Sequence, residues 1–378
     1  MDRLSAVGVT VRSIQPGDET GVVELLELVF GGWPNLDVSC SPLEYWRWKF
    51  EGRAGLGKFV FVAEAGGGEL VGCLHIIPVE FKGVHGVERC AIGVDYAVHP
   101  DYRGQGISSM LSKAINRSLF EAGFRFSYSI TSHPRVISRA VKSNLCFNGN
   151  IMNYVRVVDV DRQLEAMPMK RGWVVKAGYE ILRGFNRVRN SLGPRVSLGD
   201  VSVVEDKGFG VEAEALWGQV SPYYGFMLKR DSGYLNWRYC DSRVGGFQVR
   251  KAYDGGEFLG YCVFRVNRFR EEYPVGYVLD ILVVPGRLDA AYSLMGEAVD
   301  FFDDAGVNIV NVQAMERAWF LDALRLHGFI NSRVRLNVYL DPFGEADRVR
   351  ELVDVEPGRV LVAWGDHDAL PVQMPRHA

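Results

Sequence analysis

The sequence predicts a mixed α/β (α+β) protein of two tandem domains, each with a central, partly parallel sheet flanked by helices. Three observations support this prediction: a repeated aromatic motif, the same order of strand and helix patterns in both halves, and a length of 378 residues. At roughly 150 residues per domain, that length fits two or three domains. A hydrophobic content of 48% with 24% charged residues is typical of packed globular proteins.

The repeat consists of five matches that occur in the same order in both halves. The sequence YWRWKF at 45–50 returns as YLNWRY at 234–239, an offset of 189 residues. The offset then falls steadily to 182, as short loop deletions in a duplicated domain would produce. The other matches are Gly72 with Gly260, Asp95 with Asp280, Gly123 with Gly306, and 145–147 with 327–329.

In the first half, hydrophobic periodicity predicts four elements in sequence. An apolar strand at 92–98 precedes a helix at 107–122, whose apolar residues recur at three- and four-residue spacing. Residues 124–130 alternate between apolar and polar, as in a half-buried strand, and a short helix is expected at 136–145.

The second half repeats this order of elements. Strands are expected at 277–284, 307–314 and 334–340, with helices from 288 to about 305 and at 319–326. We therefore expect an N-terminal domain at 1–160, a basic linker at 161–204 and a C-terminal domain at 205–378. A solvated linker helix is the simpler interpretation of the basic stretch, and contact with an anionic surface or membrane is the alternative.

Charge and cysteine usage exclude several classes of protein. The 43 Lys and Arg against 46 Asp and Glu give a net charge of −3, which argues against a nucleic-acid-binding partner. The six scattered cysteines form no C-x-x-C pair, so neither a metal site nor a disulfide framework is expected. Because no apolar segment is long enough for a membrane span or a signal peptide, a cytoplasmic location is expected. The oligomeric state does not follow from the sequence.

The segment 98–108 (VHPDYRGQGIS) carries the clearest functional motif. A strand ends, the chain turns and two glycines open a helix, so backbone N–H groups converge at a positive helix terminus. Such a terminus binds phosphate groups, and Arg103 adds a permanent cation. No Gly-Lys-Ser/Thr follows for a P-loop, and Ser109 replaces the third glycine of a dinucleotide fingerprint.

The remaining pattern, R-x-x-G-x-S after V-x-P, resembles the pyrophosphate loop of the GNAT acetyltransferase superfamily. Arg103 and Gly106 match that loop, whereas Ser108 departs from it at the last small position. The resemblance implies an acetyl-CoA donor whose acyl-pantetheine lies where the strand at 92–98 splays from its neighbour at 124–130. It also implies the cofactor-binding residues, which are Ala97, Val98, Arg103, Gly104, Gln105, Gly106, Ile107 and Ser108.

The second half is expected to lack this phosphate-binding loop. By an offset of 185, Leu288, Ala291 and Ser293 would stand in place of Arg103, Gly106 and Ser108. The second domain is therefore predicted to be degenerate, shaping the acceptor pocket instead of binding a cofactor.

In this family an amine attacks a thioester directly, which needs a neutral amine, a polarised carbonyl and a proton donor for the thiolate. The tyrosine that the family often uses would fall on Lys142, so this acid is missing. Candidate catalytic residues are Asp95, Tyr128 and His133, and Tyr154 and Tyr96 are further alternatives. Each tyrosine can equally be a packing residue, His133 a loop residue, and Asp95 structural, because Asp280 repeats it.

Two further segments have a simpler reading beside a functional one. The aromatic cluster at 45–48 could stack on an acceptor, but its recurrence favours a helix packed in the core of each domain. The string WGDHD at 364–368 brings carboxylates and an imidazole together, and a turn is the better interpretation than a metal site.

Three functions remain open at this point. The favoured one is an acyl-CoA-dependent N-acetyltransferase acting on a primary amine, such as an amino sugar or another small amine. A peptidyltransferase that uses aminoacyl-tRNA would need a basic groove, and a non-catalytic acyl-CoA-binding module would bind without turnover.

Overall fold

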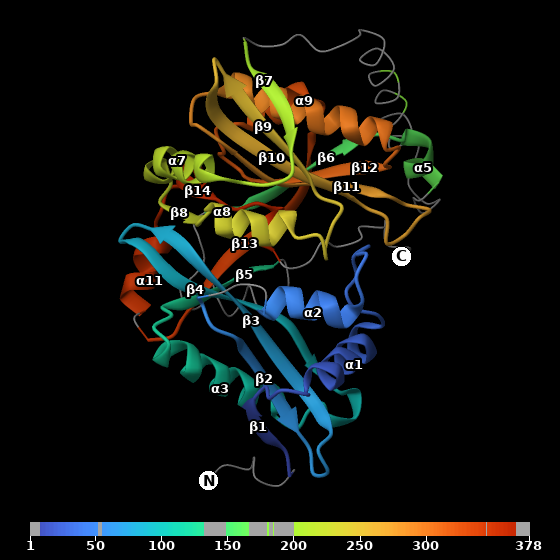
Figure 1. Ribbon diagram of the computed structural model, residues 1–378, viewed down its shortest axis with the longest axis vertical. Coiled ribbons are helices and arrows are strands. Elements are labelled where there is room, and N and C mark those ends of the chain that lie inside the picture. The colour runs from blue at the N-terminus through green and yellow to red at the C-terminus, as the bar shows by residue number, and fades with distance from the viewer. Residues whose placement is uncertain are drawn as a thin grey trace.

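The computed structural model describes residues 8–51, 55–131, 149–165, 180, 184, 200–344 and 346–367. Figure 1 shows two lobes, one above the other, with the N-terminus at the far end of the lower lobe. The mixed α/β class predicted from the sequence is confirmed. Within the described residues no helix is both long and apolar enough to cross a membrane.

The lower lobe is built from the first half of the chain. Its strands are β1 (Thr10–Ser13), β2 (Phe59–Glu64), β3 (Leu70–Gly83), β4 (Gly86–Val98) and β5 (Phe126–Thr131). Its helices are α1 (Glu19–Phe30), α2 (Pro42–Glu51) and α3 (Ile107–Glu121). The strand β6 (Ile151–Val157) and the short helix α5 (Val160–Glu165) follow and lie in the upper lobe (Figure 1).

The second half of the chain repeats this order of elements and forms most of the upper lobe (Figure 1). Its strands are β7 (Ser202–Asp206), β8 (Phe226–Leu228), β9 (Gln248–Asp254), β10 (Glu257–Asn267), β11 (Val275–Val283), β12 (Ile309–Met315), β13 (Ile330–Pro342) and β14 (Val360–Leu361). Its helices are α7 (Val211–Val220), α8 (Ser232–Leu235), α9 (Leu288–Asp304), α10 (Leu321–Leu326) and α11 (Ala346–Val353), and a π-helical turn (Asn236–Cys240) follows α8.

One continuous sheet joins the lobes, in the order β1-β2-β3-β4-β5-β13-β6-β12-β11-β10-β9-β7. At the centre of the sheet, β6 and β13 pair antiparallel. Each also pairs antiparallel with a strand of the other half, β13 with β5 and β6 with β12. Strand pairing therefore crosses the predicted domain boundaries in both directions. Those boundaries remain a prediction, since the sheet itself has no break at them.

Two sets of buried residues cover opposite faces of the lower sheet. The amphipathic helix α3 packs Ile107, Leu111 and Ile115 against one face. Helices α1 and α2 pack on the other face, in a core that is continuous with the upper lobe. The two sides of the sheet thus differ: one faces α3 alone, and the other faces the junction between the lobes.

The repeated aromatic motif lies at this junction, where α2 and the segment after α8 face each other (Figure 1). The rings of Trp48 and Trp237 stack with centroids 5.4 Å apart. Each indole Nε1 donates to the other residue's carbonyl, at 2.9 Å from Trp48 and 3.1 Å from Trp237. The motif is buried, as expected, but it joins the two copies instead of lying inside each one.

Several predicted features lie outside the described residues. These are the short helix at 136–145, the 145–147 triplet, most of the basic linker, and Asp368.

Candidate functional site

The strands β4 and β5 run in parallel for only a short distance. They pair at Cys90 with Phe126, Ala91 with Ser127 and Ile92 with Tyr128, and then they separate. Beyond Ile92, backbone groups of β4 that point away from β3 have no strand partner among the described residues. The predicted splay is therefore present, and it opens toward the end of β4 that leads into the glycine-rich loop.

A cavity of about 180 Å³ occupies this splay. It is lined by Ile92, Gly93, Val94, Tyr128, Ser129, Ile130, Asp366 and His367. Side chains alternate along a strand, so Gly93 and Ser129 belong to the α3 face, whereas Val94 and Tyr128 belong to the face at the junction. Residues of both faces line this cavity, which we call the passage.

A β-bulge in β4 lies beside the passage. His75 pairs with Val94 and Cys73 with Ala97, so Asp95 and Tyr96 both stand opposite Leu74. Asp95 has a φ of 44°, a left-handed conformation that is uncommon outside glycine. A bulge leaves backbone groups unpaired, here next to the splay.

Buried side chains hold this bulge in place. The Asp95 carboxylate accepts from Trp33 Nε1 at 2.9 Å and from Lys49 Nζ at 2.5 Å. His75 Nδ1 lies 3.0 Å from the Asp95 carbonyl, and Trp46 Nε1 lies 3.0 Å from His75 Nε2. Since an indole N–H only donates, His75 Nε2 accepts and Nδ1 donates. Both carboxylate oxygens of Asp95 are thus engaged, and this geometry favours a positioning role over proton transfer.

The glycine-rich loop connects β4 to α3 as the sequence predicts. Gly104 and Gly106 have φ values of 79° and 80°, and Gly106 is the N-cap of α3. No acceptor among the described residues takes the amides of Gly104, Gln105 and Gly106. The first helical amides, Ile107 and Ser108 among them, also lack an intrahelical partner. These donors form an anion site at the positive helix end.

Arg103 and Val98 lie at the rim of this loop. The exposed Arg103 donates from Nε to the carbonyl of Val98 at 3.2 Å, which places its guanidinium at the end of β4. Ser108 is exposed on the first turn of α3, and Ala97 is buried beside the bulge. All eight cofactor-binding residues predicted from the sequence thus lie on the last residues of β4 or on the loop and first turn that follow.

The candidate catalytic residues are only partly brought together. Tyr128 lines the passage, but its hydroxyl donates to the carbonyl of Asp366 at 2.9 Å, and burial raises its pKa well above the ordinary value. Asp95 is not among the lining residues. Tyr96 is exposed at the bulge and Tyr154 is buried in β6. His133 lies outside the described residues.

The wall opposite the strands comes from a segment that sequence reasoning treated as a simple turn. Trp364–Asp366 does form one helical turn. The buried guanidinium of Arg230 donates to Asp366 from Nη2 at 2.8 Å and to Asp280 from Nε at 2.9 Å. Burial and the nearby Asp280 raise the pKa of Asp366. These two ion pairs hold the segment Trp364–Asp366 beside the passage.

His367 is the functional candidate that sequence reasoning missed. It lines the passage, and its buried Nε2 has no hydrogen-bond partner among the described residues. Burial, and then the nearby charge of Arg238, lower the pKa of His367 to about 3, so the imidazole is neutral. The string WGDHD marked the residue, but only the tertiary fold places it beside β4 and β5.

The equivalent region of the second half is closed. All nine residues of β11 are buried, as are all seven of β12. Trp364 packs edge-on against Tyr277 of β11, with ring centroids 5.4 Å apart. The segment Trp364–Asp366, which borders the splay of β4 and β5, thus also covers the splay of β11 and β12.

The loop between β11 and α9 is also shorter than the loop between β4 and α3, which corrects the residue correspondence that the offset of 185 gave. Eight residues (99–106) separate β4 from α3, but only four (284–287) separate β11 from α9. Leu288 therefore matches Ile107 at the helix start, and Arg103 has no counterpart at 288. Arg287 pairs with Asp254 and Asp289, at 2.8 and 2.7 Å. Its charge is balanced within the protein.

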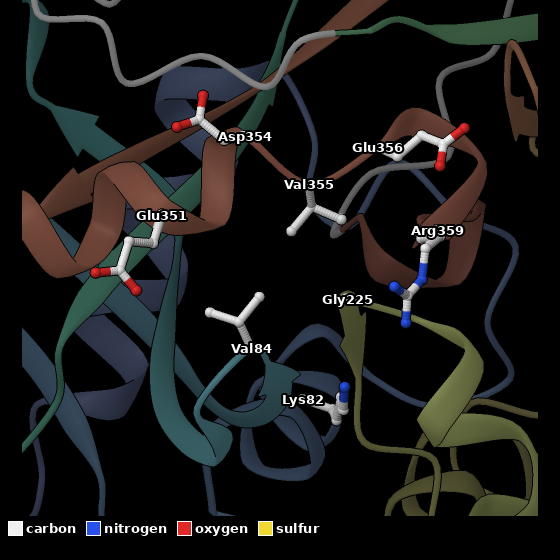
Figure 2. A pocket seen from close by; sticks show the side chains of 8 residues that line it. All are labelled: Lys82, Val84, Gly225, Glu351, Asp354, Val355, Glu356 and Arg359. Carbon is white, nitrogen blue, oxygen red and sulfur yellow. The ribbon is translucent and has the colours of Figure 1, made fainter.

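A larger cavity of about 410 Å³ lies away from both splays (Figure 2). The end of the β3–β4 hairpin, α11 and the turn at Arg359 surround it. Lys82 Nζ donates to the Tyr224 carbonyl at 2.6 Å, and Arg359 Nε donates to the Tyr223 carbonyl at 2.8 Å. Its cations thus bind the protein's own backbone, and the glycine-rich loop takes no part in it.

Comparison with known proteins agrees with this geometry. Residues 10–140 match the family model described as "Acetyltransferase (GNAT) domain". No curated protein matches the sequence significantly. The match to the family model covers the part of the chain that carries the splay and the glycine-rich loop, so this part is similar to a GNAT acetyltransferase domain.

Solved structures similar to this chain extend over both lobes. An N-myristoyltransferase of Saccharomyces cerevisiae with bound myristoyl-CoA is 12% identical, with a TM-score of 0.60 over 90% of this chain and 81% of that one. A GCN5-related N-acetyltransferase from Anabaena variabilis is 13% identical, with a TM-score of 0.58 over 87% and 72%. A probable N-acyltransferase from Enterococcus faecalis is 11% identical, with a TM-score of 0.55 over 88% and 71%. At this identity the likeness establishes a shared two-lobed fold.

Proposed function

We propose that this protein is an acyl-CoA-dependent N-acyltransferase that transfers an acetyl group to a primary amine. The observation that carries the proposal is the passage between β4 and β5, because β4 leads into the glycine-rich loop, whose amides at 104–106 have no acceptor among the described residues. A pyrophosphate on those amides would direct a pantetheine arm along β4 into the splay. The similar yeast enzyme, which holds myristoyl-CoA, supports an acyl-CoA donor.

The passage suits direct transfer because residues of both faces of the sheet line it. The donor would enter from the α3 face, where Gly93 leaves the backbone of β4 uncovered. The amine would arrive from the junction between the lobes, where Tyr128 and His367 form the wall. An unpaired amide of β4 beside the bulge would polarise the thioester carbonyl and stabilise the oxyanion.

The acetyl group is proposed because the passage is small. A cavity of about 180 Å³, walled by Ile92, Val94 and Ile130, favours a short acyl group over a long chain. The acceptor is proposed to be a small amine, such as an amino sugar, by analogy with other members of the family that the sequence resembles. We propose a cytoplasmic location for this reaction.

One observation favours a second function, an acyl-CoA-binding module without turnover. The carboxylate of Asp95 is paired with Lys49, and the hydroxyl of Tyr128 donates to a carbonyl. Asp366, another lining residue, is paired with Arg230, so the described residues of the passage offer few groups for proton transfer. Binding of acetyl-CoA without acylation of any amine would support this alternative.

Thiol release from acetyl-CoA in the presence of a panel of primary amines, amino sugars included, tests the proposal. We expect amine-dependent release of CoA thiol and an amide product heavier by one acetyl group. Gly106→Trp should abolish release, because an indole would fill the space in front of the helix end. Gly286→Trp, in the shorter second loop, is the matched control. Release that is equal with and without every amine would contradict N-acyl transfer.

A further inference from the structure

We propose that Lys49 is a positioning residue, which keeps the bulge of β4 in the geometry that acyl transfer requires. This inference rests on the proposed function and concerns the strand along which the acyl group would lie. The bulge residue Asp95 directly follows Val94, which lines the passage. A shift of the bulge would therefore displace Val94 and the backbone amides beside it.

The backbone conformation of Asp95 has to be imposed by its surroundings. Its φ of 44° lies in the left-handed region, which residues other than glycine rarely adopt. Such a conformation costs free energy and persists where several contacts impose it. Here Lys49 and Trp33 hold the carboxylate, and His75 donates to the carbonyl. The bulge is thus held at the side chain and at the backbone of one residue.

Lys49 makes the strongest of these contacts. Its Nζ lies 2.5 Å from Asp95 Oδ2, and the two side chains are only 2% and 8% exposed. A charged pair that is shielded from water interacts more strongly than a neutral hydrogen bond. The same Nζ lies 5.7 Å from the ring centroids of Trp33 and Tyr45 and 5.3 Å from that of Phe50. These rings further stabilise the ammonium at the bulge.

The helix that carries Lys49 is itself held by the second half. Trp48, the preceding residue, stacks on Trp237 and exchanges two hydrogen bonds with it. Trp46 of the same helix donates to His75, which in turn donates to the carbonyl at the bulge. The repeated aromatic motif therefore links the second half to the bulge through neighbouring residues of α2. The second half, whose own splay is closed, thus supports the site of the first.

Removing the Lys49 cation should slow the reaction without weakening donor binding. With the amine that gives the fastest thiol release, Lys49→Met should lower kcat about 10- to 100-fold, because small misplacements at a reacting centre have effects of this size. The pyrophosphate would bind the amides at 104–106, beyond the end of β4, so the Kd for acetyl-CoA should change only a few-fold in calorimetric titration. Loss of acetyl-CoA binding in folded Lys49→Met would overturn the proposal.

Lys251→Met is the matched control, because Lys251 is a buried lysine of β9 in similar surroundings. Its Nζ pairs with Asp206 and Glu212, at 2.8 and 2.7 Å, and lies 5.1 Å from the ring centroid of Phe209. This variant should lose stability in urea while its kcat stays near that of wild type. A similar loss of kcat in Lys251→Met and Lys49→Met would overturn the proposal, because the effect would then be a general one of lost stability.

Rescue at position 95 is the readout that a merely structural role would not change. Glycine adopts a left-handed φ without strain, whereas alanine does not. In the Lys49→Met background, Asp95→Gly should therefore restore at least several-fold of the lost kcat, and Asp95→Ala should not. If Lys49→Met does not fold, the two double variants, which bury neither charge of the pair, still give this comparison. Equal kcat values in the two double variants would overturn the proposal.

The wild-type protein separates a failure of this inference from a failure of the proposed function. Amine-dependent thiol release in wild type, with the same kcat in Lys49→Met, would overturn the positioning role alone. Binding of acetyl-CoA to wild type without thiol release for any amine would contradict acyl transfer, and the positioning role with it.

Discussion

The two splayed strand pairs have the same topology and opposite surroundings. In the first half, β4 is partly exposed, a cavity fills the splay and eight residues lead into α3. In the second half, β11 is wholly buried and only four residues lead into α9. The difference teaches that the fold supplies the splay, whereas binding needs an open cavity and a loop long enough to present several amides.

The aspartates of the repeat show the same divergence at the level of one side chain. In the first half Asp95 pairs with Lys49, the cation of the repeated aromatic motif. In the second half Asp280 pairs with Arg230, and the motif's cation, Arg238, donates to the carbonyls of Gly365 and His367. The cation of the motif thus pairs with the bulge aspartate in the first half, whereas in the second half it holds the wall of the passage.

Filling the open splay should have the largest effect. Ser129→Trp places an indole at an exposed position that lines the passage, so acetyl-CoA binding should be lost, with a melting temperature near that of wild type. Calorimetric titration measures the binding, and Ser202→Trp on exposed β7 is the control in the other half. Wild-type affinity in Ser129→Trp would show that the donor does not enter between β4 and β5.

Removing the buried cation of the second half, Arg230, should destabilise the protein more than removing the corresponding cation of the first half, Lys49. Arg230→Met leaves Asp280 and Asp366 buried without their partner, at a cost of about 3–5 kcal/mol in the free energy of unfolding. Lys49→Met should cost less, because Trp33 Nε1 still donates to Asp95. Urea unfolding measures both. A larger loss for Lys49→Met would reverse the comparison.

The stacked tryptophans should act as one unit that joins the halves. Trp48→Ala and Trp237→Ala each remove the same ring contact and the same pair of hydrogen bonds. The double variant should therefore be more stable than the sum of the single losses predicts, by about 1–2 kcal/mol. A double-mutant cycle in urea measures this coupling energy, and strict additivity would argue against a shared contact.

The smallest expected effect is on pH dependence. His367 has a pKa of about 3 in the folded state and an ordinary value near 6.5 when unfolded, so the unfolded state binds a proton first as pH falls. Its contribution to stability is complete above pH 6.5 and is lost progressively toward pH 3. Between pH 7 and pH 6, wild type should therefore lose about 0.7 kcal/mol more than His367→Gln. Parallel curves in chemical unfolding would show that His367 titrates normally.

The sequence predicted the parts of the structure that depend on local pattern. The start of α3 at Ile107, the glycine-rich loop and the repeated order of elements follow from periodicity and glycine placement. It also predicted that β4 and β5 splay, through the family resemblance.

Features that depend on distant segments could not be predicted in the same way. The β6–β13 pairing, the Trp48–Trp237 stack and the place of His367 each join residues of different halves. The offset of 185 failed at the second loop because its four missing residues lie between two recognisable elements and leave no mark of their own.

The central claim is that the first half alone binds the acyl donor, at the glycine-rich loop and the splay behind it. Calorimetric titration of acetyl-CoA into wild type and into the Arg103→Ala, Gly106→Trp double variant tests this claim most directly. We predict one molecule of acetyl-CoA per chain in wild type and no binding in the double variant. Two sites per chain, or binding that survives in the double variant, would contradict it.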